Sequence, residues 1–178
     1  EIRADLDADA GGRGSRLEKW LSALGCRGLE TSTCEMGLGY ASRLLEGVVA
    51  DFEAMLIYPE APDKGRSGAL YRQEGGRWIV TLAAYGGQAL PENDAEFLDF
   101  ARGLAVDSLA NHLATATSAS QIRRFRAPRA YWRHLERFDG LPEGVVVLGD
   151  AYCHFNPLFA QGMSTSLLCA VELAQALS

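Results

Sequence analysis

The sequence has no long hydrophobic run and no excess of positive charge. Its 178 residues carry 17 Lys and Arg against 23 Asp and Glu, a formal net charge of −6. A duplex-binding protein needs a basic surface to displace counterions from phosphates, and the one dense basic run, residues 123–137, lies in an acidic chain. Nucleic acid is therefore not expected as a partner. No apolar stretch approaches the roughly 20 residues of a membrane-spanning helix, so no membrane span is expected.

Cysteine is scarce, and its spacing excludes the common metal sites. The four cysteines form no C-x-x-C pair and no other metal-ligand spacing, so no metal site is predicted. Reduced thiols, together with first residues that do not resemble a signal peptide, indicate a cytoplasmic location. The first residue is not methionine, and the chain begins close to an expected strand, which favours a part of a larger protein.

What is present suits a folded protein with both helices and strands. Hydrophobic residues make up 48% of the chain, and no internal repeat is visible. The beginning predicts a strand within 4–9, a glycine-rich turn at 11–14 and an amphipathic helix over 15–24. Residues 31–57 suit short strands separated by glycines. The oligomeric state is not predicted.

Later segments carry stronger signals. Residues 77–85, rich in β-branched and aromatic side chains between two glycine pairs, predict a strand, and a helix is expected from Pro91 to Leu104. Residues 122–126, before Pro128, predict an edge strand. Val145 to Leu148 predict a strand buried on both faces, followed by a glycine turn, a loop and a helix over 163–177. That order places a helix amino terminus beside the carboxyl end of a strand, where α/β folds bind polar ligands.

Two segments carry residues suited to ligand binding. In residues 9–16, glycines allow a close backbone approach, Ser15 can cap a helix, and Arg13 or Arg16 can face a phosphate. In the second segment the Asp150 carboxylate can accept hydrogen bonds from ligand hydroxyls, and the unpaired N–H groups of the next helix can hold an electron-rich atom. A tight turn with solvated arginines and a simple strand cap are the alternatives.

Together the two segments resemble the flavin-contacting motifs of FAD-dependent monooxygenases with the p-hydroxybenzoate hydroxylase fold. Residues 145–163 resemble the family's Gly-Asp motif, and residues 4–16 resemble its Asp-Gly motif region. The resemblance implies an α/β (α+β) fold in which part of an FAD/NAD(P)-binding-type domain, residues 1–27 and 141–178, accompanies a substrate domain with a mixed β-sheet, residues 28–140. The sequence contains no Rossmann βαβ unit with the G-x-G-x-x-G pattern that grips the ADP half of FAD.

The resemblance also implies a set of cofactor-binding residues. They are Gly149, Asp150, Pro157, Gly162 and Met163 in the second segment and Gly12, Arg13 and Ser15 in the first. In the family, the aspartate bonds a hydroxyl of the flavin ribityl chain, and the proline lines the isoalloxazine ring. The N–H groups at the helix start face the pyrimidine edge of that ring, and the first segment lies near the pyrophosphate and the nicotinamide route.

Two positions depart from the family pattern, and three more are candidate substrate contacts. Gly11 stands where many relatives have the motif's aspartate, and Ala160 replaces the glycine before the Gln-Gly pair. Arg124, Arg126 and His154 are candidate substrate contacts, because such segments adjoin the substrate cavity in the resembled fold. A solvated face for the arginines and a structural role for the histidine are the alternatives. No catalytic base is predicted.

These observations predict an FAD-dependent oxidoreductase that acts on a small molecule. The resemblance implies a monooxygenase that hydroxylates an aromatic or polyketide-like substrate with NAD(P)H and O2, and this chain alone is expected to be inactive. One alternative is a flavin-dependent dehydrogenase or reductase on the same fold. Another is a non-catalytic binding module that lacks the cofactor half. A halogenase is less favoured, because its lysine and tryptophan signature is not found.

Overall fold

Two compact units, joined by two long strands, make up the computed structural model, which describes residues 4–60 and 65–178. Unit 1 combines the described residues up to Glu35 with Arg129–Ser178, and unit 2 comprises Met36–Pro128. Strands β2 (Thr31–Glu46) and β7 (Arg123–Arg133) each run through a boundary between the units. The boundaries between the compact units therefore lie within strands. The division into an FAD-binding part and a substrate domain at residues 27/28 and 140/141 stays a prediction.

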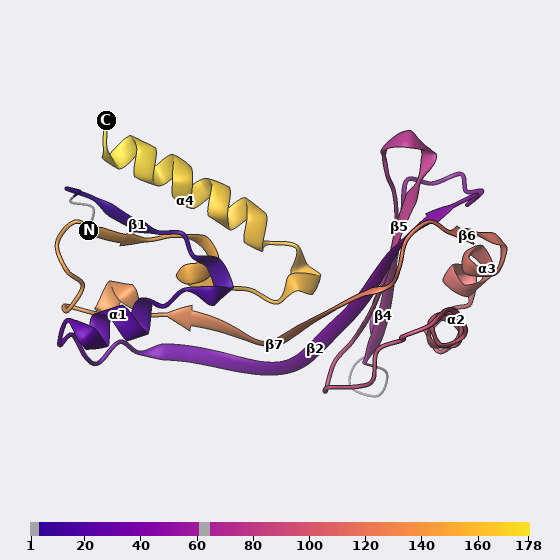
Figure 1. Ribbon diagram of the computed structural model, residues 1–178, viewed down its shortest axis with the longest axis horizontal. Helices are drawn as coiled ribbons and strands as arrows, with labels where there is room; N and C mark the ends of the chain where they lie inside the picture. Colours follow the sequence, from indigo (N-terminus) through magenta and orange to yellow (C-terminus); the bar gives the residue numbers. More distant parts are fainter. Residues whose placement is uncertain (1–3, 61–64) are drawn as a thin grey trace. The chain divides into compact units, whose positions relative to one another are not determined.

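Unit 2 is built on an antiparallel sheet (Figure 1). Besides most of β2 and the first half of β7, its strands are β3 (Ala54–Ile57), β4 (Arg66–Arg72), β5 (Trp78–Ala84) and β6 (Thr117–Ser118). The order of these strands is β3-β4-β5-β2-β7, with β6 paired to β2. Two helices, α2 (Asp94–Arg102) and α3 (Ser108–Thr115), follow β5.

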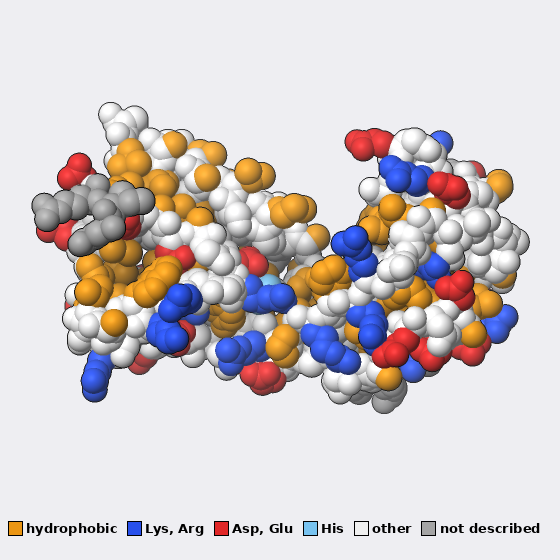
Figure 2. All heavy atoms as spheres, in the orientation of Figure 1, with side chains coloured by type: hydrophobic (Ala, Val, Ile, Leu, Met, Phe, Trp, Pro, Cys, Tyr) orange, Lys and Arg blue, Asp and Glu red, His pale blue; other side chains and the backbone are white. Residues whose placement is uncertain are grey.

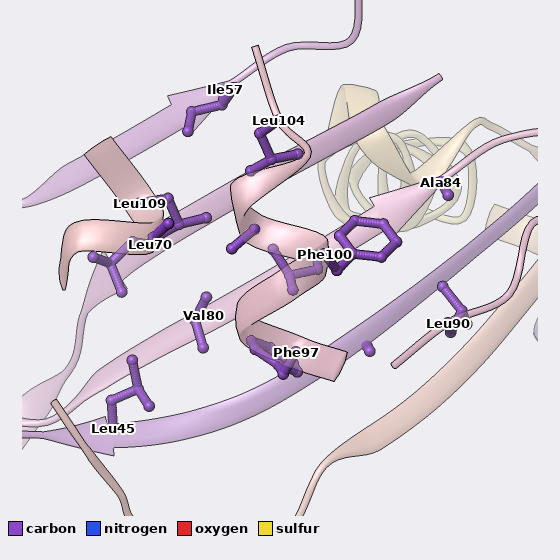
Figure 3. Close-up of a cluster of buried hydrophobic side chains, with 14 of the residues drawn as sticks. Leu45, Ile57, Leu70, Val80, Ala84, Leu90, Phe97, Phe100, Leu104 and Leu109 are labelled. Atoms are coloured by element: carbon purple, nitrogen blue, oxygen red, sulfur yellow. The ribbon is translucent and has the colours of Figure 1, made fainter. Parts of the chain in front are cut away.

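The core of unit 2 lies between one face of this sheet and the two helices (Figure 3). Strand β5 illustrates why the core lies on one face, since successive side chains of a strand point to opposite faces of the sheet. Trp78, Val80 and Leu82 are at most 3% exposed and join Phe97 of α2 and Leu109 of α3 in one hydrophobic cluster. The alternate residues of β5 lie on the opposite face, whereas α2 and α3, the two helices described in unit 2, both pack against the first face.

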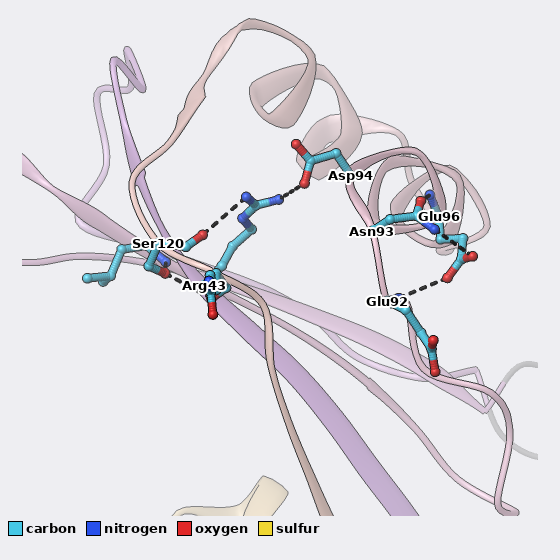
Figure 4. A network of polar contacts seen from close by, with 8 residues as sticks. Arg43, Glu92, Asn93, Asp94, Glu96 and Ser120 are labelled. Carbon is cyan, nitrogen blue, oxygen red and sulfur yellow. Dashed lines mark hydrogen bonds and ion pairs between the residues drawn. The ribbon is translucent and has the colours of Figure 1, made fainter.

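A buried arginine ties α2 to the sheet (Figure 4). The Arg43 side chain is 7% exposed, and it donates to Asp94 Oδ1 at 2.6 Å and to the Ser120 carbonyl oxygen at 3.2 Å. The helix begins at an Asn93 cap that accepts the Glu96 N–H at 3.0 Å, so the helix expected after Pro91 is confirmed.

Unit 1 contains a short parallel sheet and two helices. Strand β1 (Asp7–Asp9) pairs with β8 (Val145–Val147), and β9 (Cys153–His154) pairs with the end of β7. Residues 145–147 are half-buried, so the expected burial on both faces is not met within the described chain, where this sheet has two strands. The helices are α1 (Leu17–Ala23) and α4 (Gly162–Ala176).

The surface of α4 is largely apolar and uncovered. Leu167, Leu168 and Val171 are 69%, 63% and 51% exposed, and α4 has no buried residue. Figure 2 shows a row of hydrophobic side chains over this helix. A helix with an apolar surface of this kind is normally covered by further protein. Among the described residues, no helix is both long and apolar enough to cross a membrane.

Other sequence expectations need correction in extent. The strand expected at 122–126 begins at Arg123 and continues through Pro128 to Arg133. Strand β9 pairs with β7 only at Tyr131 and Trp132, beyond the segment that was expected to lie at an edge. Its register with β9 covers Tyr131 and Trp132, so the missing N–H of Pro128 falls outside that pairing. Strand β4 and helix α3 were not expected from the sequence.

Candidate functional site

A sharp turn follows β8 and depends on Gly149. This residue begins the short 3-10 helix η4 (Gly149–Ala151) with φ +57°, in the left-handed region. A Cβ atom at this position would lie 2.6 Å from Ser166 Oγ on α4. Both the backbone conformation and the close approach of α4 therefore require glycine here. The turn delivers Asp150 to the amino-terminal end of α4.

The two carboxylate oxygens of Asp150 have different surroundings. His154 Nδ1 lies 2.9 Å from Oδ2. A Cβ placed on Gly162 would lie 3.4 Å from Oδ1, so this oxygen lies beside the first residue of α4. The Asp150 side chain is 32% exposed. It is therefore able to offer an oxygen to a ligand.

The amino terminus of α4 has no side-chain cap. The N-cap residue Gln161 makes no capping hydrogen bond, and the first hydrogen bond of the helix turn runs from the Thr165 N–H to the Gln161 carbonyl oxygen at 3.0 Å. The preceding N–H groups, including those of Gly162 and Met163, have no partner within the helix. Fifteen aligned peptide dipoles place partial positive charge at this end. Such an end suits an electron-rich ring edge.

The loop before α4 holds Pro157 and a strained alanine. The Asn156 side chain accepts the Leu158 N–H at 3.1 Å, and Pro157 begins the short helix η5 (Pro157–Phe159). Ala160 ends this helix at φ 52° and ψ 27°. Of the described residues other than glycine, Ala160 alone has positive φ. A glycine at this position would fit the backbone without strain, whereas alanine does not.

Replacing Ala160 by glycine is expected to stabilise the protein. The left-handed conformation costs an alanine roughly 1–2 kcal/mol, and the extra chain entropy of glycine returns part of this, so we expect a net gain of about 0.5–1 kcal/mol. Thermal unfolding of the complete protein measures the change. The matched control is Ala170→Gly inside α4, expected to cost about 1 kcal/mol. A lower melting temperature for Ala160→Gly would contradict the interpretation.

In the turn of residues 9–16, the carboxylate that holds the backbone is that of Asp9. The Asp9 carboxylate accepts the Gly11 N–H at 2.9 Å and the Ser15 hydroxyl at 2.5 Å. Ser15 Oγ in turn accepts the Leu17 N–H at 3.1 Å at the start of α1. A Cβ on Gly11 would lie 2.9 Å from Asp9 Oδ1. The departure at Gly11 thus accompanies a turn in which Asp9 holds the backbone.

The structure brings most of the predicted cofactor-binding residues together. The helix η1 (Gly12–Gly14) contacts η4, and η4 contacts the start of α4. Tyr131 of β7 donates its hydroxyl to the Asp150 carbonyl oxygen at 2.6 Å. Burial raises the pKa of Tyr131, partly offset by Arg133, and this keeps the phenol protonated as a donor. These contacts lie within unit 1.

A basic groove of about 860 Å³ lies along α1 in unit 1. Its charged lining residues are Arg13, Arg16, Glu18, Lys19, Arg129 and Arg133. Glu18 forms an ion pair with Arg133, whose Nε donates to Glu18 Oε1 at 3.1 Å. The groove therefore carries a net positive charge suited to phosphate. Sequence reasoning named Arg13 and Arg16 as candidates to face a phosphate. It did not place Arg129 and Arg133 of β7 beside them, because that depends on how the strands pair.

The candidate substrate residues fall in different units. Arg124 and Arg126 belong to unit 2, where Arg124 forms an ion pair with Glu92 and both line a hollow of about 500 Å³ beside Leu90. His154 belongs to unit 1, and its side chain is 8% exposed. Their contact with a substrate stays a prediction.

The helix-free face of the sheet in unit 2 carries an aromatic pair that sequence reasoning missed. The rings of Tyr40 and Phe125 stack with centroids 5.4 Å apart at 25°. On the same face of β2 the hydroxyls of Ser42 and Thr81 lie 2.7 Å apart. This face combines a flat aromatic surface with two hydroxyls, a suitable platform for a planar organic molecule. Among the described residues, no group of His, Cys, Asp and Glu could hold a metal ion.

Comparison with known proteins gives a relative and a shared fold. The chain is 33% identical over 183 residues to Protein Rv3254 of Mycobacterium tuberculosis, a match that covers 99% of this chain and 37% of the relative. No family model matches the sequence. The chain thus spans about a third of the length of its curated relative.

Solved structures share the fold at low sequence identity. They include Klebsiella pneumoniae HpxO complexed with FAD and uric acid (TM-score 0.61, 21% identity, 93% of this chain and 40% of that chain). A 2-methyl-3-hydroxypyridine-5-carboxylic acid oxygenase matches with TM-score 0.63 and 17% identity over 99% of this chain and 46% of the other. The flavin-dependent brominase Bmp2 matches with TM-score 0.65 and 13% identity over 93% and 40%. The chain has the fold of the substrate-binding part of FAD-dependent monooxygenases.

Proposed function

We propose that this chain supplies the substrate domain and the flavin-facing part of an FAD-dependent oxidoreductase. The observation that carries the proposal is the Asp150 carboxylate, delivered by the Gly149 turn beside the uncapped amino terminus of α4. A carboxylate accepts hydrogen bonds from ribityl hydroxyls, and the helix end suits the pyrimidine edge of the flavin ring. The residues present therefore fit the flavin end of FAD, its ribityl chain and its ring.

The proposed reaction is the hydroxylation of an aromatic or polyketide-like molecule with NAD(P)H and O2. When bound, FAD supplies the redox and oxygen chemistry. The N–H groups at Gly162 and Met163 would stabilise negative charge on the ring, and Pro157 would line it. The stacked pair of Tyr40 and Phe125 in unit 2 offers a flat surface for a planar substrate. Uric acid in the HpxO complex is a planar ligand of this kind in a protein of the same fold.

The basic groove along α1 is the proposed route for NAD(P)H. Arg13, Arg16 and Lys19 line it on one side, and Arg129 lines it from β7. A pyrophosphate would gain charge-assisted hydrogen bonds from such a lining. A cytoplasmic location, proposed from the free cysteines, accords with this use of a reduced nucleotide.

Reversing one charge in the groove is expected to weaken NAD(P)H binding. Lys19 is exposed and lies on the groove wall, so Lys19→Glu replaces attraction for phosphate by repulsion. We expect the KM for NAD(P)H to rise about 10-fold, equivalent to about 1.4 kcal/mol, with FAD affinity unchanged. Steady-state flavin reduction measures this. The control is Arg77→Glu, an exposed charge reversal in unit 2. Equal effects of both variants would reject the groove as the route.

Two other functions remain testable. A flavin-dependent dehydrogenase or reductase would use the same cofactor contacts, and product analysis with and without O2 separates it from a hydroxylase. A non-catalytic binding module would keep the Tyr40–Phe125 face without flavin. The retained Asp150 site favours the enzymatic alternatives.

The visible absorbance spectrum of the complete protein is the direct test. A flavin band in the purified protein, retained through gel filtration, is the expected result. A colourless protein that also fails to take up added FAD would overturn the proposal and favour the binding module.

A further inference from the structure

The imidazole of His154 is buried against the carboxylate that the proposed function assigns to FAD. Its side chain is 8% exposed, and Nδ1 lies 2.9 Å from Asp150 Oδ2. The rings of His154 and Tyr131 lie 5.6 Å apart between centroids. Strand β9, which carries His154, pairs with β7 through Tyr131 and Trp132. The ring is therefore fixed by the sheet on one side and by Asp150 on another.

The second ring nitrogen faces no partner. His154 Nε2 is buried and has no hydrogen-bond partner in the part of the chain that the structure describes. Burying an N–H group without an acceptor costs more free energy than burying a nitrogen lone pair without a donor. The arrangement thus favours the tautomer with the proton on Nδ1, which donates to Asp150.

Two side chains hold the backbone around Asp150. Tyr131 donates to the Asp150 carbonyl oxygen at 2.6 Å, and Arg133 donates to the carbonyl oxygen of Ala151. Both donors come from β7. The backbone of η4 is therefore fixed from β7, whereas His154 contacts the Asp150 carboxylate through Oδ2.

We propose that His154 is a positioning residue that orients the Asp150 carboxylate toward a hydroxyl-bearing ligand. The imidazole forms its hydrogen bond with Oδ2. Oδ1 then lies beside the first residue of α4, where it could accept a hydrogen bond from a ribityl hydroxyl. The identity of the ligand as FAD rests on the proposed function. Because Nε2 is buried, it is not accessible to a substrate, so we assign His154 a positioning role instead of a direct substrate contact.

The affinity of the complete protein for FAD tests the role by a double-mutant cycle. His154→Leu removes the donor, and we expect FAD binding to weaken about 10-fold, because a hydrogen bond to a charged group contributes roughly 1.5–3 kcal/mol and part of the orientation survives. In the Asp150→Ala background, His154→Leu should have no further effect. His154→Asn, whose amide N–H can reach the position of Nδ1, should recover most of the affinity. His112→Leu in α3, a histidine beside Phe52, is the matched control.

A second measurement is independent of flavin. Nitrogen-15 NMR of histidine-labelled complete protein, with His154→Asn identifying the signal, reports which ring nitrogen carries the proton. We expect the Nδ1–H form in the wild type and a loss of that preference in Asp150→Ala. This signature would not change if the histidine only filled space.

The two measurements separate failure of the inference from failure of the proposed function. Equal weakening by His154→Leu with and without Asp150, no recovery in His154→Asn, or a proton on Nε2 would each overturn the positioning role. A wild-type protein that binds no FAD would overturn the proposed function, and the NMR result would then decide the positioning role alone.

Discussion

Asp150→Ala in the complete protein is expected to weaken FAD binding by about 100-fold, because a hydrogen bond to an ionised acceptor contributes up to about 3 kcal/mol. The substitution removes both carboxylate oxygens and leaves the Tyr131 bond to the Asp150 carbonyl oxygen in place. The turn should therefore keep its backbone while losing its ligand contact. Fluorescence titration with FAD measures the change.

The control for this prediction is a carboxylate of the same unit. Asp139 is exposed in the loop before β8, so Asp139→Ala should leave the affinity for FAD unchanged. Circular dichroism of the variants checks that the fold is retained. Unchanged FAD affinity in a folded Asp150→Ala protein would remove the central assignment of the site.

The second large effect concerns Gly37, within β2. This residue has φ +58°, and a Cβ there would lie 2.7 Å from the backbone nitrogen of Gly87 and 3.0 Å from the carbonyl carbon of Gly86. Backbone atoms cannot move aside as a flexible side chain does. Gly37→Ala should therefore add the cost of the left-handed conformation to that of overpacking, about 3 kcal/mol in total.

Gly47 separates the two contributions. It has φ +74°, yet a Cβ there would meet nothing within 4 Å, so Gly47→Ala should cost only about 1 kcal/mol. Urea unfolding followed by tryptophan fluorescence, to which the buried Trp78 of unit 2 contributes, measures both. If the two variants lost the same free energy of unfolding, the close approach of β2 to Gly86 and Gly87 would not contribute to the cost of Gly37→Ala.

Local signals explain which elements could be predicted. The helix α2 was expected because Pro91 and a polar first turn precede apolar residues at helical spacing, and its Asn93 cap is a local contact. Strand β2 could not be predicted as one strand of sixteen residues, because its glycines read as breaks. Gly37 is tolerated there because Gly86 and Gly87 donate to backbone oxygens of β2, a contact made about fifty residues away in sequence.

The candidate site likewise contains some residues that the local sequence predicts and others that depend on contacts between distant segments. Gly149, Asp150 and Gly162 could be predicted because they lie close together in the chain, with a turn, a loop and a helix start in order. The stacking of Tyr40 on Phe125 depends on the pairing of β2 with β7 and leaves no local signal. Nor does the sequence show that His154 points toward Asp150, because neighbouring residues of a loop have many relative orientations.

The continuous strands between the two units constrain how this protein can be recombined. Since β2 and β7 pass from one unit to the other without a loop, a middle segment from a relative must be joined inside a strand at both ends. An insertion of one residue there would exchange the two faces of the sheet beyond the junction. Only grafts that change each strand by an even number of residues would keep the aromatic face and the helix-covered face on their own sides.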